Sequence, residues 1–236
     1  MRPLPAEFIE LPGIRLAYCQ HGSGLDLLLL HGNSESKRIF SSYQQEHFAA
    51  FRTFALDTRG HGQSRSKDTL LTFDQISDDV IAFCRAKGIE RACVIGYSDG
   101  GNTALMLAHK DPARFPRLAA ISPNYLVSGT TDGTLREIRR IYRLMSLLKR
   151  AGLPVQKHLL RFDLMLRDMG ISEAALQGIR TNLLILYAEH DMIKEDHLQR
   201  LAGLVPGARL QKIMGCTHMT IYRHPEAIQA MRDFLG

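Results

Sequence analysis

The sequence predicts an α/β protein built on a mostly parallel sheet with helices on both faces. Short apolar runs alternate with longer segments of helical periodicity, which is the pattern of strands joined by crossover helices. The later runs are apolar throughout, as expected for strands that are buried on both faces. At 236 residues the chain can bury one sizeable core, so we expect one domain with an inserted subdomain.

Eight strands and five helices account for most of this pattern. The expected strands cover residues 7–11, 14–20, 25–30, 53–57, 92–97, 118–122, 183–188 and 209–214. The expected helices cover residues 37–50, 73–87, 99–110, 192–204 and 224–235. Pro12-Gly13 indicates a hairpin between the first two strands. Asp111-Pro112 ends the third helix, because a residue before proline avoids the helical region, and Pro225 lies in the first turn of the last helix.

Residues 124–180 interrupt the alternation of strands and helices. They fit three successive helices over residues 132–151, 154–169 and 172–179. In the first of these, apolar residues from Leu135 to Leu148 recur at helical spacing, and arginines occupy the opposite face. We therefore expect a helical cap (124–180) inserted into a core made of residues 1–123 and 181–236. Ordinary crossover helices are the alternative interpretation.

The net charge of +6 is concentrated in this insert. Residues 124–180 contain ten basic and five acidic side chains, so +5 belongs to the cap and +1 to the core. A basic cap can steer anionic substrates, including phosphate-bearing thioesters, or contact an anionic membrane. The simpler interpretation is that the charges form a solvated helix face. The sequence has no platform of aromatic and basic residues for nucleic acid, so no nucleic-acid partner is expected. The longest apolar run has six residues, Leu183 to Ala188, against about 20 for a membrane span, so no stable membrane association is expected.

The four cysteines match no metal or disulfide pattern. Cys19, Cys84, Cys93 and Cys216 form no CxxC pair and no cluster with histidine of the kind that binds zinc. We therefore expect free thiols, no metal and no cofactor. The first residues carry charges and prolines without an apolar stretch, so no signal peptide is expected and a cytoplasmic protein is predicted. The sequence does not indicate an oligomeric state.

The segment Gly96-Tyr97-Ser98-Asp99-Gly100-Gly101 joins an expected strand to an expected helix. A serine between small residues in such a turn fits a nucleophile elbow, a strained turn that exposes the hydroxyl above a helix N-terminus. The pattern GxSxG alone is a weak signal, and its position between strand and helix strengthens it. Ser98 is therefore the expected nucleophile.

A serine nucleophile needs a base and an orienting acid, and both are expected downstream at strand ends. Asp191 follows the strand at 183–188 and His218 follows the strand at 209–214, so both should reach the same end of the sheet. Other candidates stay open at this point. The alternative acids are Glu189 and Asp196, and the alternative bases are His190, His197 and His224.

The turn His31-Gly32-Asn33 follows the third expected strand. Its backbone can supply an oxyanion donor, so the N–H groups of Asn33 and Asp99 are the expected pair. Asp99, Tyr97 and His31 are also candidate substrate contacts. The polar turn from Asp57 to Ser64 is expected to be scaffold, with Asp57 and Arg59 as structural partners.

Together these motifs resemble the α/β-hydrolase superfamily over nearly the whole chain. The Gly-x-Ser-Asp-Gly-Gly elbow is similar to that of the biphenyl-hydrolase-like, valacyclovirase-like esterases. The resemblance implies an α/β-hydrolase fold with an eight-stranded sheet, and acyl transfer to water by Ser98, His218 and Asp191. Dehalogenases and epoxide hydrolases of this fold carry an aspartate at the position of Ser98, so they fit less well.

The resemblance implies a small-molecule ester as substrate. Asp99, next to the nucleophile, suggests an aminoacyl ester, although a carboxylate there also favours the helix N-terminus. Thioesterase, lactonase, C–C bond hydrolase and cofactor-free haloperoxidase activities use the same triad and stay open. A non-catalytic ligand receptor is the alternative of another class, and such proteins usually lack part of the triad.

Overall fold

The computed structural model describes residues 4–236, so the first three residues of the expected core lie outside it. Within this range the strands form one nine-stranded sheet in the order β1-β2-β4-β3-β6-β7-β8-β9, with β5 paired to β2. Their bounds are β1 Glu7–Leu11, β2 Ile14–His21, β3 Asp26–Leu30, β4 Arg52–Asp57, β5 Arg65–Ser66, β6 Ala92–Tyr97, β7 Arg117–Ile121, β8 Asn182–His190 and β9 Arg209–Thr217. The strands from β4 to β9 along this order pair in parallel, and the pairs that β2 makes are antiparallel.

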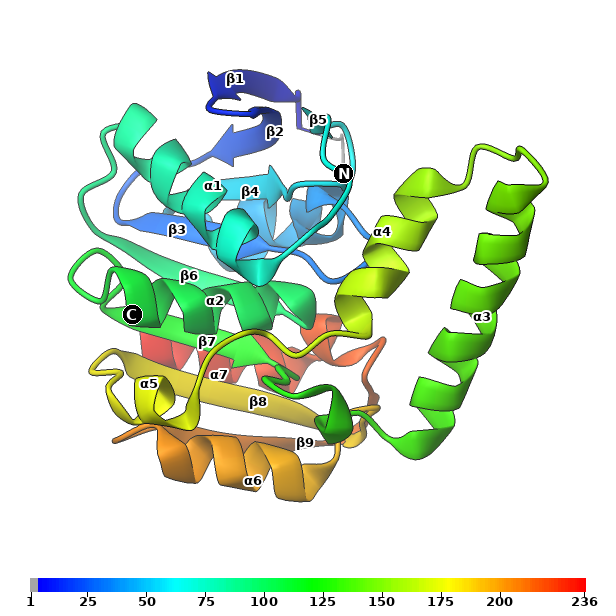
Figure 1. Ribbon diagram of the computed structural model, residues 1–236. Helices are drawn as coiled ribbons and strands as arrows, with labels where there is room; N and C mark the ends of the chain where they lie inside the picture. The colour runs from blue at the N-terminus through cyan, green and yellow to red at the C-terminus, as the bar shows by residue number, and fades with distance from the viewer. Residues whose placement is uncertain (1–3) are drawn as a thin grey trace.

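The helices cover both faces of the sheet, as Figure 1 shows. They are α1 Phe73–Ala86, α2 Asp99–Lys110, α3 Asp132–Arg150, α4 Gln156–Met165, α5 Glu173–Gln177, α6 Glu195–Leu204 and α7 Pro225–Leu235. Alternate residues of one strand enter different cores. Leu28 and Leu30 pack with α1, α2, α5 and α6, whereas Leu27 and Leu29 pack with α7. The predicted mostly parallel sheet with helices on both faces is therefore confirmed, and β5 is a ninth strand beyond the eight expected.

The parallel register brings the carboxyl ends of neighbouring strands together. Leu30 of β3 pairs with Gly96 of β6, Tyr97 pairs with Ile121 of β7, and Ile121 pairs with Leu186 of β8. A β-bulge between Ala188 and His190 then shifts the pairing of β8 with β9. The turns that follow these strands therefore lie along one edge of the sheet, where open α/β sheets place their sites.

The prediction of one continuous helix over residues 37–50 is wrong. The segment instead forms a 3₁₀ turn, Lys37–Phe40, and a π turn, Tyr43–His47. Its buried side chains are held by partners on separate elements. Lys37 Nζ lies 2.6 Å from Asp57 Oδ2, Gln44 donates to the Cys19 carbonyl, and the Tyr43 hydroxyl donates to the Tyr222 carbonyl. These anchors set the backbone path in place of helical periodicity.

The expected pairing of Asp57 with Arg59 is also wrong. Asp57 is fully buried and binds the buried Lys37. Arg59 points to the other side of the turn, where its guanidinium lies 2.6 Å from Asp79 and 2.5 Å from Asp68. The turn after β4 is therefore fixed by two separate ion-pair groups.

The insert between β7 and β8 divides into two parts. Helices α3 and α4 project beyond the strand ends at the right of Figure 1, and α5 lies beside the sheet next to α6. Leu176 of α5 is fully buried in the main core. The part of the insert that overhangs the strand ends is therefore α3 and α4. In residues 4–236 no helix is long and apolar enough to cross a membrane.

Candidate active site

Ser98 lies in a strained turn between β6 and α2. Its φ is +53°, a region that residues other than glycine rarely adopt. The turn also requires the two neighbouring glycines. A Cβ on Gly96 would lie 2.1 Å from the Gly100 carbonyl oxygen, and a Cβ on Gly100 would lie 2.0 Å from the Leu30 carbonyl oxygen. This is the tight strand-to-helix geometry expected of a nucleophile elbow, and it places Ser98 at the first turn of α2.

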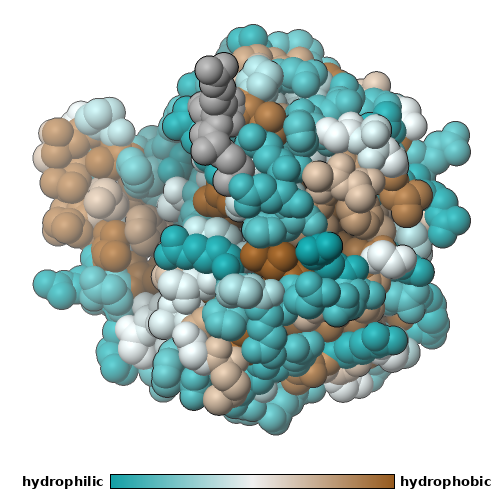
Figure 2. All heavy atoms as spheres, turned by 180° about the vertical axis from the view of Figure 1, so that it is seen from behind, coloured by the Kyte–Doolittle hydropathy of each residue, from teal (hydrophilic) through white to brown (hydrophobic). Residues whose placement is uncertain are grey.

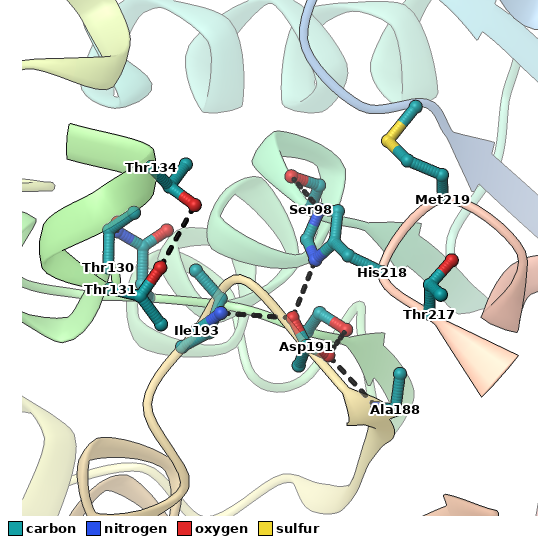
Figure 3. A network of polar contacts seen from close by, with 12 residues as sticks. Ser98, Thr130, Thr131, Thr134, Ala188, Asp191, Ile193, Thr217, His218 and Met219 are labelled. Carbon is teal, nitrogen blue, oxygen red and sulfur yellow. Dashed lines mark hydrogen bonds and ion pairs between the residues drawn. The ribbon is translucent and has the colours of Figure 1, made fainter. Parts of the chain in front are cut away.

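The side chains of Ser98, His218 and Asp191 form a chain of contacts, shown in Figure 3. His218 Nε2 lies 3.2 Å from Ser98 Oγ, and His218 Nδ1 lies 2.7 Å from Asp191 Oδ1. A carboxylate only accepts hydrogen bonds, so Nδ1 carries the proton in this pair and Nε2 is left as the acceptor for the serine hydroxyl. The three residues come from the turns after β6, β9 and β8, as the sequence predicted.

Asp191 accepts hydrogen bonds at both carboxylate oxygens. Oδ1 also accepts from the Ile193 amide at 3.0 Å, and Oδ2 accepts from the Ala188 amide at 2.9 Å and from Ser122 Oγ at 2.5 Å. Burial raises the pKa of Asp191, but the bonds and charge of His218 and the bonds from Ser122 and Ala188 outweigh it and hold the pKa below its ordinary value. Asp191 is therefore ionised and fixed in orientation at neutral pH.

The alternative acids and bases lie elsewhere. Glu189 is exposed and accepts from the Gly215 amide, and Asp196 binds the amide of its neighbour. His190 is exposed at the end of β8, His197 stacks on Tyr125 with ring centroids 4.6 Å apart, and His224 precedes α7. The geometry therefore favours Asp191 and His218 over each of them.

Asn33 and Asp99, the expected oxyanion pair, lie in contact. Asn33 Nδ2 donates to Asp99 Oδ2 and to the carbonyl of Arg161 in α4, both at 2.9 Å. The amide of Gly32 is already used, because it donates to Glu35 Oε2. The Asp99 amide lies in the first turn of α2, where N–H groups lack intrahelical acceptors. The arrangement leaves the Asn33 and Asp99 amides as the candidate donors.

Two carboxyl groups near Ser98 have raised pKa values. Burial raises the pKa of Asp99 to about 6, against the opposing effects of the Asn33 hydrogen bond and the charge of His218. Burial also raises the pKa of Glu35, against the hydrogen bond from Gly32. Sequence reasoning did not single out Glu35, because it belongs to no motif and reaches the site only through the fold of the turn after β3.

Of the candidate substrate contacts, Tyr97 and His31 are placed differently. Tyr97 lines the outer cavity described below, and its hydroxyl donates to the His218 carbonyl at 2.9 Å. His31 is 1% exposed, accepts from the Thr58 amide and packs against His61. The expectation that His31 contacts substrate is wrong, because its ring points into the scaffold beneath the turn and lines neither cavity at Ser98.

Two cavities of different size meet at Ser98. The inner cavity has a volume of about 20 Å³, and the outer cavity has a volume of about 420 Å³. The inner one is lined by Phe73, Ser98, Asp99, Asn102, Asn124, Thr130, Ile138, Leu164, Met165, Arg167, Met192 and Ile193. The outer one is lined by Gly32, Asn33, Ser34, Glu35, Tyr97, Ser98, Ile141, Phe162, Met165, Met192, His218 and Met219. Met165 and Met192 border both, so they separate the two spaces.

Ser122 is a further residue that sequence reasoning missed. It is fully buried after β7, has a φ of +50°, and directs its hydroxyl to Asp191. A single serine after a strand carries no sequence motif, so only the structure identifies it. Among the described residues there is no group of three or more His, Cys, Asp or Glu side chains arranged to hold a metal ion.

Comparisons with known proteins identify the family and the fold of the chain. A family model described as alpha/beta hydrolase fold matches residues 27–144. The chain is similar to the dihydrolipoyllysine-residue acetyltransferase component of the acetoin cleaving system of Cupriavidus necator. The two are 32% identical over 149 residues, which cover 59% of this chain and 40% of that relative. The chain thus matches less than half the length of this curated relative.

Solved structures show the same fold. A thermophilic esterase from Thermogutta terrifontis matches with a TM-score of 0.75 and 21% identity, over 98% of each chain. The enol-lactonase from Burkholderia xenovorans LB400 matches with a TM-score of 0.77 and 20% identity, over 97% of this chain and 99% of that one. The family model spans half of the chain and includes β4 to β7 and the elbow at Ser98, so this chain belongs to the alpha/beta hydrolase fold family.

Proposed function

We propose that this protein is a serine hydrolase that cleaves small carboxylic esters through an acyl-enzyme. The observation that carries the proposal is the contact chain from Ser98 Oγ to His218 Nε2, 3.2 Å, and from His218 Nδ1 to Asp191 Oδ1, 2.7 Å. A strained serine, a base in reach and a buried, ionised acid are the parts that nucleophilic acyl transfer needs.

The reaction follows from this geometry in two half-reactions. Ser98 Oγ attacks the ester carbonyl as His218 Nε2 takes the hydroxyl proton, and the same proton then goes to the departing alcohol. Water, activated by His218, hydrolyses the acyl-enzyme. Asp191 holds the tautomer of His218, and the amides of Asn33 and Asp99 stabilise the oxyanion. Loss of one such donor typically lowers the rate by about 10²–10³.

The sizes of the two cavities favour a small acyl group and a larger, apolar alcohol. The leaving alcohol must receive its proton from His218, which lines the outer cavity of about 420 Å³. The acyl group then extends to the Asp99 side, where the inner cavity of about 20 Å³ has room for about one water-sized group. Acetyl esters are therefore the best-fitting class.

The cap carries exposed apolar side chains in addition to those that line the outer cavity. Ile141, Phe162 and Met165 line the cavity on the cap side. Figure 2 shows hydrophobic side chains gathered on the side of the cap that is seen from behind, at the left. Leu144, Leu147 and Leu153 of the cap region are about half exposed, at 52%, 59% and 48%. An extended apolar alcohol would cover part of this surface.

A second candidate class is an ester with an amino group on a very small acyl chain. Asp99 lines the inner cavity, and its carboxylate could pair with an ammonium. Glycyl and acetyl esters of one alcohol, compared on wild type and on Asp99→Asn, separate the classes. Equal discrimination by both enzymes rejects the amino ester. Lactones, thioesters and C–C bonds fit the same triad and belong in the same substrate panel.

Two series of esters test the cavity assignment. One series holds acetate fixed and lengthens the alcohol, and the other holds ethanol fixed and lengthens the acyl chain. We expect kcat/KM to rise along the first series and to fall steeply along the second. Ser98→Ala is the control for background hydrolysis.

A matched pair of variants on α3 sharpens this test. Ile138 lines the inner cavity and Ile141, one turn later, lines the outer cavity. Ile138→Ala should extend the tolerated acyl chain and leave the alcohol series unchanged, and Ile141→Ala should alter only the alcohol series. The reverse pattern would show that the acyl group occupies the outer cavity.

A further inference from the structure

A separate hollow lies between the turn after β4 and the cap helix α4. It has a volume of about 280 Å³ and does not include any of the triad residues. Its lining residues come from 60–71 and from 156–161. Four of them are cationic: Arg65, Lys67, Lys157 and Arg161. Four cations and one carboxylate, Asp68, give the lining a positive net charge, which favours an anionic ligand.

Arg161 is the least exposed of the four cations that line this hollow. It is partly buried, and its Nε donates to the Gly60 carbonyl at 2.9 Å. Among residues 4–236, no carboxylate lies within the 4.0 Å ion-pair distance of its guanidinium. Burial lowers the pKa of Arg161, with no carboxylate acting against it. A guanidinium that loses water without a counter-ion is unfavourable, and a bound anion would offset that cost.

The one carboxylate that lines the hollow is already occupied. Asp68 Oδ2 lies 2.5 Å from Arg59 Nη1, on the core side of the turn. Lys157 lies one helical turn before Arg161 on α4, so both side chains can contact the same ligand. The hollow also borders the first turn of α4, which contains no acidic residue and whose dipole favours negative charge.

We propose that this hollow, lined by Arg161, Lys157, Arg65 and Lys67, binds a phosphate dianion, either free or as the phosphoryl group of a larger metabolite. The planar guanidinium of Arg161 matches two phosphate oxygens, and the lysines supply point charges. The anion would hold α4 of the cap to the turn after β4. This site is separate from the proposed ester-cleaving site and does not depend on that activity.

The hollow is linked to the ester-cleaving site by one side chain. The carbonyl of Arg161 accepts a hydrogen bond from Asn33 Nδ2, which also donates to Asp99. An anion that fixes Arg161 would therefore also fix the position of the Asn33 side chain. Binding at the hollow can then alter the turn that carries an oxyanion donor.

The test is calorimetric titration with inorganic phosphate and with phenyl phosphate, at an ionic strength held constant with chloride. We expect wild type to bind phosphate, and Arg161→Met to weaken binding about tenfold or more. Arg139→Met is the matched control, because Arg139 is an exposed cap arginine outside the hollow. Tighter binding of phenyl phosphate than of inorganic phosphate indicates the phosphoryl group of a larger metabolite as ligand, and the opposite order indicates free phosphate.

The outcomes separate this proposal from the proposed function. Binding that is absent from folded wild type, or equal in Arg161→Met, overturns the proposal, as does an equal loss in Arg139→Met. Lys157→Met, at an exposed position, provides a second variant should Arg161→Met fail to fold, and it should weaken binding about threefold or more. The titration measures the heat of phosphate binding and not ester turnover, so its result can be interpreted even if the protein has no esterase activity.

Discussion

Replacing Ser122 by alanine or glycine should weaken the support of Asp191 without removing any member of the triad. The Ser122 hydroxyl is one of four donors to the Asp191 carboxylate, and at 2.5 Å it is the shortest of them. Both substitutions remove the hydroxyl. They differ in backbone effect, because alanine keeps the strain of the +50° φ and glycine relieves it.

The size of the effect follows from the charge of the acceptor. A buried hydrogen bond to a charged group contributes about 1.5–3 kcal/mol. For a domain of this size 1 kcal/mol corresponds to about 2–4 °C in Tm, so each variant should melt about 3–12 °C lower. Ser122 is one of the donors that hold the pKa of Asp191 down, so that pKa rises in both variants. With one donor fewer, Asp191 holds the His218 ring less firmly, so kcat/KM should fall in both variants.

The assay combines thermal denaturation with the measurement of kcat/KM on an acetate ester. If the hydroxyl matters, both variants lose stability and both have a lower kcat/KM. If the +50° backbone alone matters, Ser122→Gly should be at least as stable as wild type. A glycine variant with wild-type Tm and wild-type kcat/KM would refute the reasoning.

Three further changes have expected outcomes. The raised pKa of Asp99, about 6, means that the folded state binds the proton of this carboxyl group more tightly than the unfolded state does. The free energy of unfolding of Asp99→Asn, relative to that of wild type, should therefore increase by about 2 kcal/mol between about pH 4 and pH 6. A difference in Tm between the two proteins that is constant with pH would contradict this. Lys37→Met leaves the buried carboxylate of Asp57 unpaired and should cost about 3–5 kcal/mol in urea unfolding, so a loss below about 1 kcal/mol would argue against the pair. Gly100→Ala should prevent folding, because the added Cβ would lie 2.0 Å from the carbonyl oxygen of Leu30 in β3. Gly203→Ala in α6 should be neutral or stabilising, because no neighbouring atom lies within 4 Å of the added Cβ. A soluble Gly100→Ala protein with native circular dichroism would contradict the account of the elbow.

The sheet and the meeting of Ser98, His218 and Asp191 could be predicted from sequence because both depend on local pattern. Buried parallel strands give continuous apolar runs, and the chemistry lies in the few residues after each run. Ser98, Asp191 and His218 each follow such a run, so topology alone brings them to one edge. The two-residue strand β5, Arg65–Ser66, is too short to leave any periodic signal.

The remaining features depend on contacts between distant parts of the chain. The turns at residues 37–47 are set by Asp57, Cys19 and Tyr222, and no local pattern encodes such partners. Ser122 acts through a backbone conformation and a neighbour on another strand. His31 and Asn33 are two residues apart in one turn, yet one points into the scaffold and the other toward Asp99. Spacing cannot decide such orientations.

The central claim is that Ser98 is a nucleophile activated by His218. The most direct measurement is intact mass after reaction with a fluorophosphonate, followed by peptide mapping. The account predicts one adduct on Ser98 in wild type, none in Ser98→Ala, and strongly slowed labelling in His218→Ala. A folded wild-type protein that gains no adduct, or an adduct on another residue that persists in Ser98→Ala, would contradict it.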